Sequence, residues 1–414
     1  MKILFSKKYI WIYVYLYLIF QTTIQNTTQG IINKIVTYSD DLICLILLFC
    51  LIIRLLRKRT VVEGKGELFA IVFYTLYLSI GVFCGSMHDY QKIRYILLDM
   101  FTCSKFVIVY FASKVLSEKY IDDDFLFSLN KGLELMAVVL FVLTLHDLVF
   151  TPFFEKSEYR YFTNSIKLFF YHPEALARAC AGVIYPLAYN MKKQKENIIY
   201  ILMLCFVMFF TFRMKSVAAM VIFLLLYIYR KYISGKNIAL LFAVAVLICL
   251  VIGRGQMKFY FSMPEIGRTK LVTDSVTLAN EHFPLGTGFG SFGSNAALEH
   301  NSLLYENMGY YDKNNKWAVK EYLNDAFWPI VVAQTGWIGT VFFCLAILCL
   351  LLKGVKLYKT EFFSGWVILM VLLYDLVSTL GSSAFYHPMS LSGYMFAGIV
   401  TSQYLNTKRS VKEK

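Results

Sequence analysis

Apolar runs that approach the length of a membrane span recur along almost the whole chain. An α-helix needs about 20 residues to cross the hydrocarbon core of a bilayer. Runs of about that length, counted with their flanks, occur at 9–20, 42–56, 68–85, 95–116, 125–150, 173–190, 198–212, 217–229, 238–252, 326–352, 362–380 and 389–405. Because only helices and closed barrels satisfy their backbone groups in lipid, these runs predict an all-α polytopic membrane protein with about twelve transmembrane helices.

The composition agrees with this prediction and argues against a soluble protein. Of the 414 residues, 58% are hydrophobic and only 16% are charged, and the mean hydropathy is +0.57. A soluble domain cannot bury so much apolar surface. The net charge of +14 is compatible with nucleic-acid binding, but most basic residues flank the apolar runs, as they do in loops beside a membrane. We therefore expect no nucleic-acid partner.

The lysines and arginines indicate an orientation. If the N-terminus is cytoplasmic and the runs alternate in direction, the inner segments collect more than half of the 41 basic residues, including those of RLLRKRTVVEGKG (54–66) and the tail TKRSVKEK. This excess follows the positive-inside rule. All six histidines then fall in outer loops or near outer helix ends. We expect a multi-pass plasma-membrane protein with both termini in the cytoplasm.

One long polar segment, residues 254–325, interrupts the apolar pattern. It predicts spans 1–9 in residues 1–253, a large extracytoplasmic loop in 254–325 between spans 9 and 10, and spans 10–12 with a cytoplasmic tail in 326–414. The N-terminal MKILFSKK lacks a small-residue cleavage site, so we interpret it as the start of the first helix. The nine cysteines lie in apolar runs without a CxxC pair, so we expect neither a disulfide framework nor a metal site.

Charged residues inside spans are expensive and are therefore candidates for function. Arg178 lies four residues after Glu174, so both side chains share one helix face; the alternative is an ion pair that only locks this helix to its neighbours. Arg213 and Lys215 lie at the junction of two short runs, where they either bind a ligand or anchor the helix ends at the interface. Three further charged residues are candidates for partners buried within the bundle: Asp99, Lys105 and Asp375.

The long polar segment contributes more basic residues and many glycines. Arg254, Arg268 and Lys270 precede the stretch PLGTGFGSFGSNAALEHNSLLYENMG. Arginines at the outer surface suit a pyrophosphate, because guanidinium groups stay charged and offer paired donors to phosphate oxygens. Glycines such as Gly288 and Gly290 let backbone N–H groups or a ligand approach closely. GTGFGSFG is not followed by the GK[ST] of a nucleotide P-loop and lies outside the cytoplasm, which excludes a phosphate-loop NTPase.

The order of motifs from Gly267 onward resembles that of the Wzy-type polysaccharide polymerases and the related O-antigen ligases. These motifs are GRTKLVTDS, HFPLGTGFGSFGS, HNSLLY and a helix that opens with Gly-x-x-Gly. The run NDAFWPIVVAQTGWIG is most similar to the capsular-polysaccharide polymerases of low-GC Gram-positive bacteria, and RACAGVIYP and FRMKSVAAM add weaker support.

The resemblance implies a membrane glycosyltransferase on the outer face of the membrane. Such enzymes transfer a glycan from undecaprenyl pyrophosphate to the sugar of another lipid-linked repeat unit, without a metal, cofactor or nucleotide sugar. The family's arginines correspond to Arg178, Arg213 and Arg268, which would hold the pyrophosphate and stabilise its developing charge; Lys215 and Arg254 are alternatives. Membrane lipid, a flippase and a chain-length regulator of the same pathway are the expected partners.

The acceptor hydroxyl needs a base, and the resemblance to the ligases assigns this role to His300, beside Asn301. Some capsule polymerases carry an aromatic residue at this place, so Asp325 and Glu299 are alternatives. Asn301 would face the acceptor. Five aromatic residues either stack on sugar rings or lie at the lipid interface: Phe289, Phe292, Tyr305, Tyr310 and Tyr311.

Two other functions fit the sequence. An O-antigen-ligase-like enzyme would use the same donor but pass the glycan to a different acceptor, such as peptidoglycan, teichoic acid or protein. A transporter or flippase of lipid-linked oligosaccharide is expected to show broken helices in two matching halves. The first half contains no second copy of the 254–325 segment, which favours the enzyme.

Overall fold

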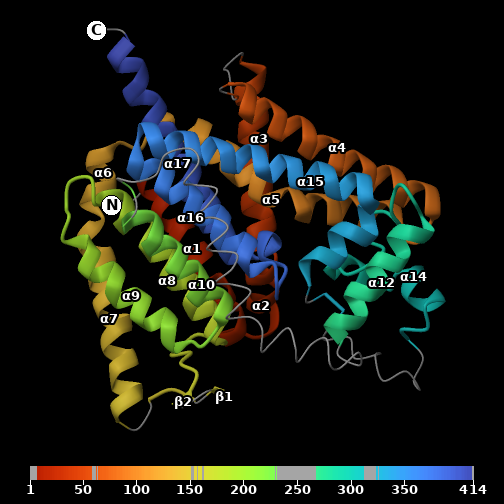
Figure 1. Ribbon diagram of the computed structural model, residues 1–414, viewed down its shortest axis with the longest axis horizontal. Helices are drawn as coiled ribbons and strands as arrows, with labels where there is room; N and C mark the ends of the chain where they lie inside the picture. The colour runs from red at the N-terminus through yellow and green to blue at the C-terminus, as the bar shows by residue number, and fades with distance from the viewer. Residues whose placement is uncertain are drawn as a thin grey trace.

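The computed structural model describes residues 7–57, 62, 64–150, 153–155, 157–160, 163–228, 230, 267–311, 323–324 and 326–412 (Figure 1). The first half contains α1 (Lys7–Thr27), α2 (Gly30–Thr37), α3 (Ser39–Leu56), α4 (Lys65–His88), α5 (Ile93–Leu116), η1 (Ser117–Lys119), α6 (Asp123–Ser128), α7 (Asn130–Val149), β1 (Tyr159–Arg160), β2 (Thr163–Asn164) and α8 (Pro173–Asn190). The second half contains α9 (Asn197–Phe210), α10 (Met214–Ile228), α12 (Gly267–Glu281), α13 (Asn295–Glu299), α14 (Leu303–Asn307), α15 (Phe327–Thr360), α16 (Phe362–Ser378), η4 (Ala384–Tyr386) and α17 (Pro388–Lys412).

The predicted all-α class is confirmed. Each predicted apolar run falls on a helix, except 238–252, which lies outside the described residues. The run 125–150 divides into α6 and α7 at Leu129. The only sheet in the described part of the chain is the antiparallel hairpin of β1 and β2.

Several helices have the length and composition of membrane spans. Within the described residues, 4 helical segments are long and apolar enough to cross a bilayer: Lys65–His88, Ile93–Lys119, Asp123–Val149 and Phe327–Thr360. Three further apolar helices are shorter: α9, α10 and α16. The protein is therefore a helical membrane protein.

The helices enclose one large core, and the long polar segment folds a smaller one of its own. The large core is filled by fully buried rings such as Tyr77, Phe106, Phe343 and Trp366. The smaller core packs α12 and α14 together through Leu271, Leu278, Phe292, Leu304, Tyr305 and Tyr310. In Figure 1 the elements of this smaller core lie at the right of the molecule, whereas both chain termini lie at the upper left.

A glycine-rich loop, residues 284–294, joins the two cores by crossing a break in α15. Gly336 interrupts that helix with φ 63° and ψ −165°. The carbonyls freed by the break accept hydrogen bonds from the loop: Thr287 N–H donates to Ala333 O (2.9 Å) and Gly288 N–H to Gln334 O (2.8 Å). Non-helical backbone at membrane depth is tolerated where protein satisfies it in this way.

Asp99 of α5 fixes the next turn of the glycine-rich loop. Its buried carboxylate accepts from Gly290 N–H (2.7 Å) and from the Gln334 side-chain amide (2.9 Å). Gln334 also donates to Phe292 O (2.8 Å). Several donors offset the cost of burying this carboxylate. The prediction that Asp99 finds partners inside the bundle is confirmed by these contacts.

The other charged residues predicted to find buried partners also do so. Lys105 pairs with Asp40 (2.7 Å) and Asp41 (2.5 Å) of α3, and this contact ties α5 to α3. Asp375 of α16 pairs with Arg178 of α8 (3.4 Å). These pairs lie between helices, where an unpaired charge would cost several kcal/mol, roughly 3–5.

Candidate functional site

The start of α8 is shaped by the sequence Tyr171-His172-Pro173. Proline suits the first position of a helix because its fixed φ is already helical and it has no N–H to leave unpaired. The preceding His172 caps the helix, with its Nδ1 accepting from Glu174 N–H (3.2 Å). This start fixes the positions of Glu174 and, one turn later, Arg178.

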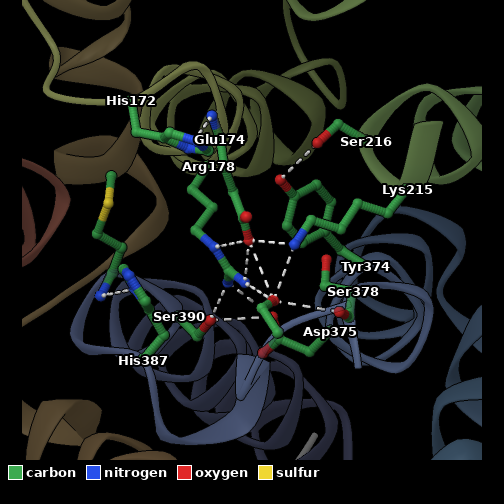
Figure 2. Close-up of polar contacts among 12 residues, drawn as sticks. His172, Glu174, Arg178, Lys215, Ser216, Tyr374, Asp375, Ser378, His387 and Ser390 are labelled. Carbon is green, nitrogen blue, oxygen red and sulfur yellow. Dashed lines mark hydrogen bonds and ion pairs between the residues drawn. The ribbon is translucent and has the colours of Figure 1, made fainter. Parts of the chain in front are cut away.

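Arg178 lies at the centre of a polar group at this end of the bundle. Its guanidinium donates to Glu174 Oε1 (3.0 Å), to Ser390 Oγ of α17 (2.6 Å) and to Asp375 Oδ1 of α16 (3.4 Å). The Arg178 side chain is only 3% exposed. Figure 2 shows its guanidinium among Glu174, Asp375 and Ser390. The predicted i,i+4 pair is thus present, and Arg178 also locks α8 to α16 and α17.

Lys215, at the start of α10, reaches the same carboxylate. Its Nζ lies 2.6 Å from Glu174 Oε1 and 2.9 Å from Ser382 Oγ. Ser382 belongs to the connection between α16 and α17 and donates to Glu174 Oε1 (3.1 Å). Glu174 therefore binds two cations from different helices, which Figure 2 shows converging on it.

Arg213 approaches from the tight turn between α9 and α10. Phe212 takes a positive φ of 48° there, which directs the chain into α10. Arg213 Nη2 lies 2.8 Å from His172 Nε2 and 3.8 Å from Glu158 Oε2. Glu158 is also bound by Arg160 of the β1–β2 hairpin (2.7 Å). The hairpin therefore borders the site.

Arg268, in the first turn of α12, brings the polar segment to the same place. A Cβ added to Gly381 would lie 3.8 Å from Arg268 Nη1, so this guanidinium lies beside the α16–α17 connection. Its positive charge acts on both Arg213 and Lys215. We call Arg178, Arg213, Lys215, Arg268, Glu174 and Asp375 the basic cluster.

The basic cluster carries a surplus of positive charge. Counted over the described residues alone, its four basic and two acidic side chains leave two positive charges in excess, and Glu158 and Arg160 beside it balance each other. The carboxylates lower the electrostatic cost of holding several cations together. A surplus of this kind, partly removed from water, favours a polyanion such as pyrophosphate.

Burial keeps the imidazoles beside the basic cluster uncharged. Desolvation and the Arg213 charge lower the pKa of His172 to about 4. His387 caps α17 with Nδ1 accepting from Met389 N–H (3.2 Å), and desolvation and Arg178 lower its pKa to about 3. Burial, Arg160 and Arg268 lower the pKa of the Arg213 guanidinium, which still stays protonated at neutral pH.

His300 and Asn301 lie on a different part of the protein. The His300 ring stacks on Tyr95 of α5, with ring centroids 3.6 Å apart, and Arg94 covers the same tyrosine (4.4 Å to the ring centroid). Asn301 is exposed with a φ of 48°. No contact recorded among the described residues joins His300 to the basic cluster. Asp325 and Arg254 lie outside the described residues.

The glycine-rich loop differs from the prediction. Its backbone N–H groups do not face a ligand, because those of Gly288 and Gly290 are bound by Gln334 O and Asp99. A Cβ on Gly288 would overlap the backbone of Gly85 in α4. The glycines therefore permit close contact of protein backbones.

The prediction that five aromatic residues stack on sugar rings or lie at the lipid interface is wrong for four of them. Phe289, Phe292, Tyr305 and Tyr310 are buried in the two cores. The Tyr305 hydroxyl accepts from Gly293 N–H (2.7 Å) and donates to Leu323 O (3.2 Å). These four side chains supply the apolar surface that the polar segment buries on folding. They therefore neither stack on sugar nor lie at the lipid interface.

Sequence reasoning missed four members of the site: His172, Ser382, His387 and Ser390. One signal pointed to two of them, because Tyr-His-Pro occurs twice, at the starts of α8 and α17. The serines had no signal, since their role depends on the fold of the α16–α17 connection. A comparison of the chain with models of protein families and with curated protein sequences finds no match.

Proposed function

We propose that the protein is a membrane glycosyltransferase that polymerises undecaprenyl-pyrophosphate-linked repeat units into a capsular or other surface polysaccharide. The enzyme would be a multi-pass plasma-membrane protein of about twelve spans, with both termini cytoplasmic and the polar segment outside. The proposal combines the motif order from Gly267 onward with the basic cluster.

The observation that carries the proposal is the convergence of basic side chains from separate elements. These side chains come from three separate places in the sequence: Arg178 from α8, Arg213 and Lys215 from the start of α10 and the turn before it, and Arg268 from α12. Repulsion among the four cations is offset in part by Glu174 and Asp375, and a bound anion would offset it further. The three arginines are also those that the resemblance to the polymerases singles out.

The proposed reaction needs little beyond binding and charge stabilisation. The acceptor hydroxyl oxygen forms a bond to the anomeric carbon of the donor glycan, and the bond from that carbon to the pyrophosphate oxygen breaks. The electron pair goes to the pyrophosphate, whose charge the basic cluster would stabilise; one charge-assisted hydrogen bond contributes about 1.5–3 kcal/mol. The hydroxyl proton passes to a base.

The base in this proposal is His300, which rests on the resemblance to the ligases; because no contact among the described residues joins His300 to the basic cluster, Asp325 is kept as the alternative. The imidazole of a histidine can accept a proton from a hydroxyl group that lies within hydrogen-bonding reach. Its ring is held by Tyr95 rather than by a carboxylate. In the proposal, Asn301 lies beside it on the side from which the acceptor arrives.

The test is the fate of lipid-linked glycans in a strain that lacks this gene, with their sidedness probed by an added glycosidase that cannot cross the membrane. We expect single repeat units to accumulate on the outer face. Full-length but unattached chains would instead indicate a ligase, and single units trapped on the inner face would indicate a flippase.

A further inference from the structure

His172 faces a donor at each ring nitrogen: Glu174 N–H lies 3.2 Å from Nδ1, and Arg213 Nη2 lies 2.8 Å from Nε2. A neutral imidazole carries one proton and therefore has a single acceptor nitrogen. In either tautomer, one of the two donors is thus left without an acceptor on the ring. In the tautomer that caps α8, Nδ1 accepts from Glu174 N–H and Nε2 carries the proton, so His172 is an N–H donor on its other side.

That donor faces a second donor. His172 Nε2 lies 2.8 Å from Arg213 Nη2, and a guanidinium has no acceptor atom. Two N–H groups that point at each other repel, whereas one oxygen atom between them would accept from both. Arg213 Nε is also buried and has no hydrogen-bond partner in the described part of the chain. Two nitrogens of the Arg213 guanidinium, Nη2 and Nε, therefore lack a hydrogen-bond acceptor among the described residues.

In this tautomer, the neighbouring carboxylates are bound by other cations and do not satisfy the two donors. Glu158 Oε2 is 3.8 Å from Arg213 and is already bound by Arg160. Glu174 Oε1 is bound by Arg178, Lys215 and Ser382. Since the pKa of His172 is lowered to about 4, the ring stays neutral at physiological pH and keeps a single N–H.

We propose that His172 Nε2–H and the Arg213 guanidinium together bind one anionic oxygen of the pyrophosphate substrate. This inference rests on the proposed function and adds His172 as a neutral recognition residue beside the arginines. The neutral imidazole N–H would donate to the pyrophosphate oxygen along one fixed direction, and Arg213 would supply the positive charge that attracts this oxygen. The β1–β2 hairpin would border this oxygen through Glu158 and Arg160.

The test uses the full chain purified in detergent and inorganic pyrophosphate as the probe, with affinity measured by calorimetric titration. His172→Asn retains an oxygen that can accept from Glu174 N–H but loses the donor at Nε2, and asparagine is a good N-cap residue. We expect its affinity for pyrophosphate to fall about 10- to 100-fold, since a hydrogen bond to a charged group contributes about 1.5–3 kcal/mol. His172→Gln, whose longer amide reaches the Nε2 position, should retain most of the affinity.

Asp122→Asn is the matched control. Asp122 also caps a helix, accepting from Phe125 N–H (2.8 Å) at the start of α6, but it has no contact with the basic cluster among the described residues. Its affinity should equal that of the wild type. His172→Ser, another good N-cap without the donor, replaces His172→Asn if that variant does not fold.

The outcomes separate the two proposals. Wild-type binding of pyrophosphate together with unchanged affinity in a folded His172→Asn variant would overturn the role of His172 and leave the proposed function standing. A wild-type protein that does not bind pyrophosphate would overturn both. Equal losses in His172→Asn and Asp122→Asn would mean that any change of a helix cap lowers the affinity and would also overturn the inference.

Discussion

The basic cluster and the glycine-rich loop both place polar groups in buried positions, but they balance those groups differently. In the glycine-rich loop, the backbone donors of Thr287, Gly288 and Gly290 each meet one protein acceptor. In the basic cluster, the two carboxylates bind Arg178 and Lys215, and Arg213 and Arg268 add two further cations. These backbone donors of the loop are satisfied within the protein, whereas the basic cluster has an excess of positive charge that can attract an anion.

The glycines of this loop have a different role from those of a phosphate-binding loop. A glycine-rich stretch beside basic residues is typical of a phosphate-binding loop. Here the close approach that glycine permits is used against α4 and α15, where Gly288 meets Gly85. We therefore expect substitutions in the loop to lower stability, and substitutions at the rim of the basic cluster to lower activity in a folded protein.

The largest loss of stability is expected for Arg178→Ala, the one cluster residue that also holds helices together. The change leaves Glu174 and Asp375 without their shared cation, and breaking a buried pair costs about 3–5 kcal/mol. The midpoint of thermal unfolding in detergent should fall well below that of the wild type. Arg178→Lys keeps a charge and should lose less. An unchanged midpoint in Arg178→Ala would show that the ion pairs do not stabilise the bundle.

Gly288→Ala should be the most damaging change in the glycine-rich loop. The added Cβ would overlap the backbone of Gly85, and the positive φ of 92° is itself unfavourable for alanine, so we expect a loss of roughly 3 kcal/mol. Gly309→Ala is the control, because Gly309 has a φ of 70° but no atom of the described residues lies within 4 Å of the Cβ that alanine would add. It should lose only about 1 kcal/mol. Similar midpoints for the two variants would contradict the packing role of Gly288.

Asp99→Asn should have an intermediate effect. The amide presents a donor where the carboxylate accepted from Gly290 and Gln334, so one buried donor loses its partner at a cost of about 1–3 kcal/mol. Asp89→Asn is the control, since Asp89 is exposed with a positive φ that asparagine tolerates. Thermal midpoints measured side by side test this, and equal values would mean that Asp99 does not anchor the loop.

Acid should weaken the region around the basic cluster through its histidines. Their folded-state pKa values, about 4 for His172 and about 3 for His387, lie below the ordinary value of about 6.5. Below about pH 6.5 the unfolded chain therefore binds more protons, and stability falls as the pH drops toward 4. The double variant His172→Gln/His387→Gln should show a shallower fall in thermal midpoint. A slope as steep as that of the wild type would contradict the buried, neutral state of both rings.

The sequence predicted the helices well because membrane spans are long apolar runs that need no tertiary context. It also predicted the Glu174–Arg178 pair, since that contact follows from helix geometry alone. It could not predict that Asp375, Ser382 and Ser390 complete the site, because these contacts depend on how α16 and α17 pack against α8. Tyr305 was misinterpreted for a related reason: an aromatic residue in a polar segment can be buried by a core that the segment itself forms.

The most direct test of the account is the length of glycan chains made by Arg268→Ala. Arg268 belongs to the basic cluster but sits on α12 rather than in the bundle, so the variant should reach the membrane in normal amount. Electrophoresis of lipid-linked and surface glycans should then show single repeat units on the outer face and almost no long chains. Wild-type chain length in a strain that depends on Arg268→Ala would contradict the role of the basic cluster in binding the pyrophosphate donor.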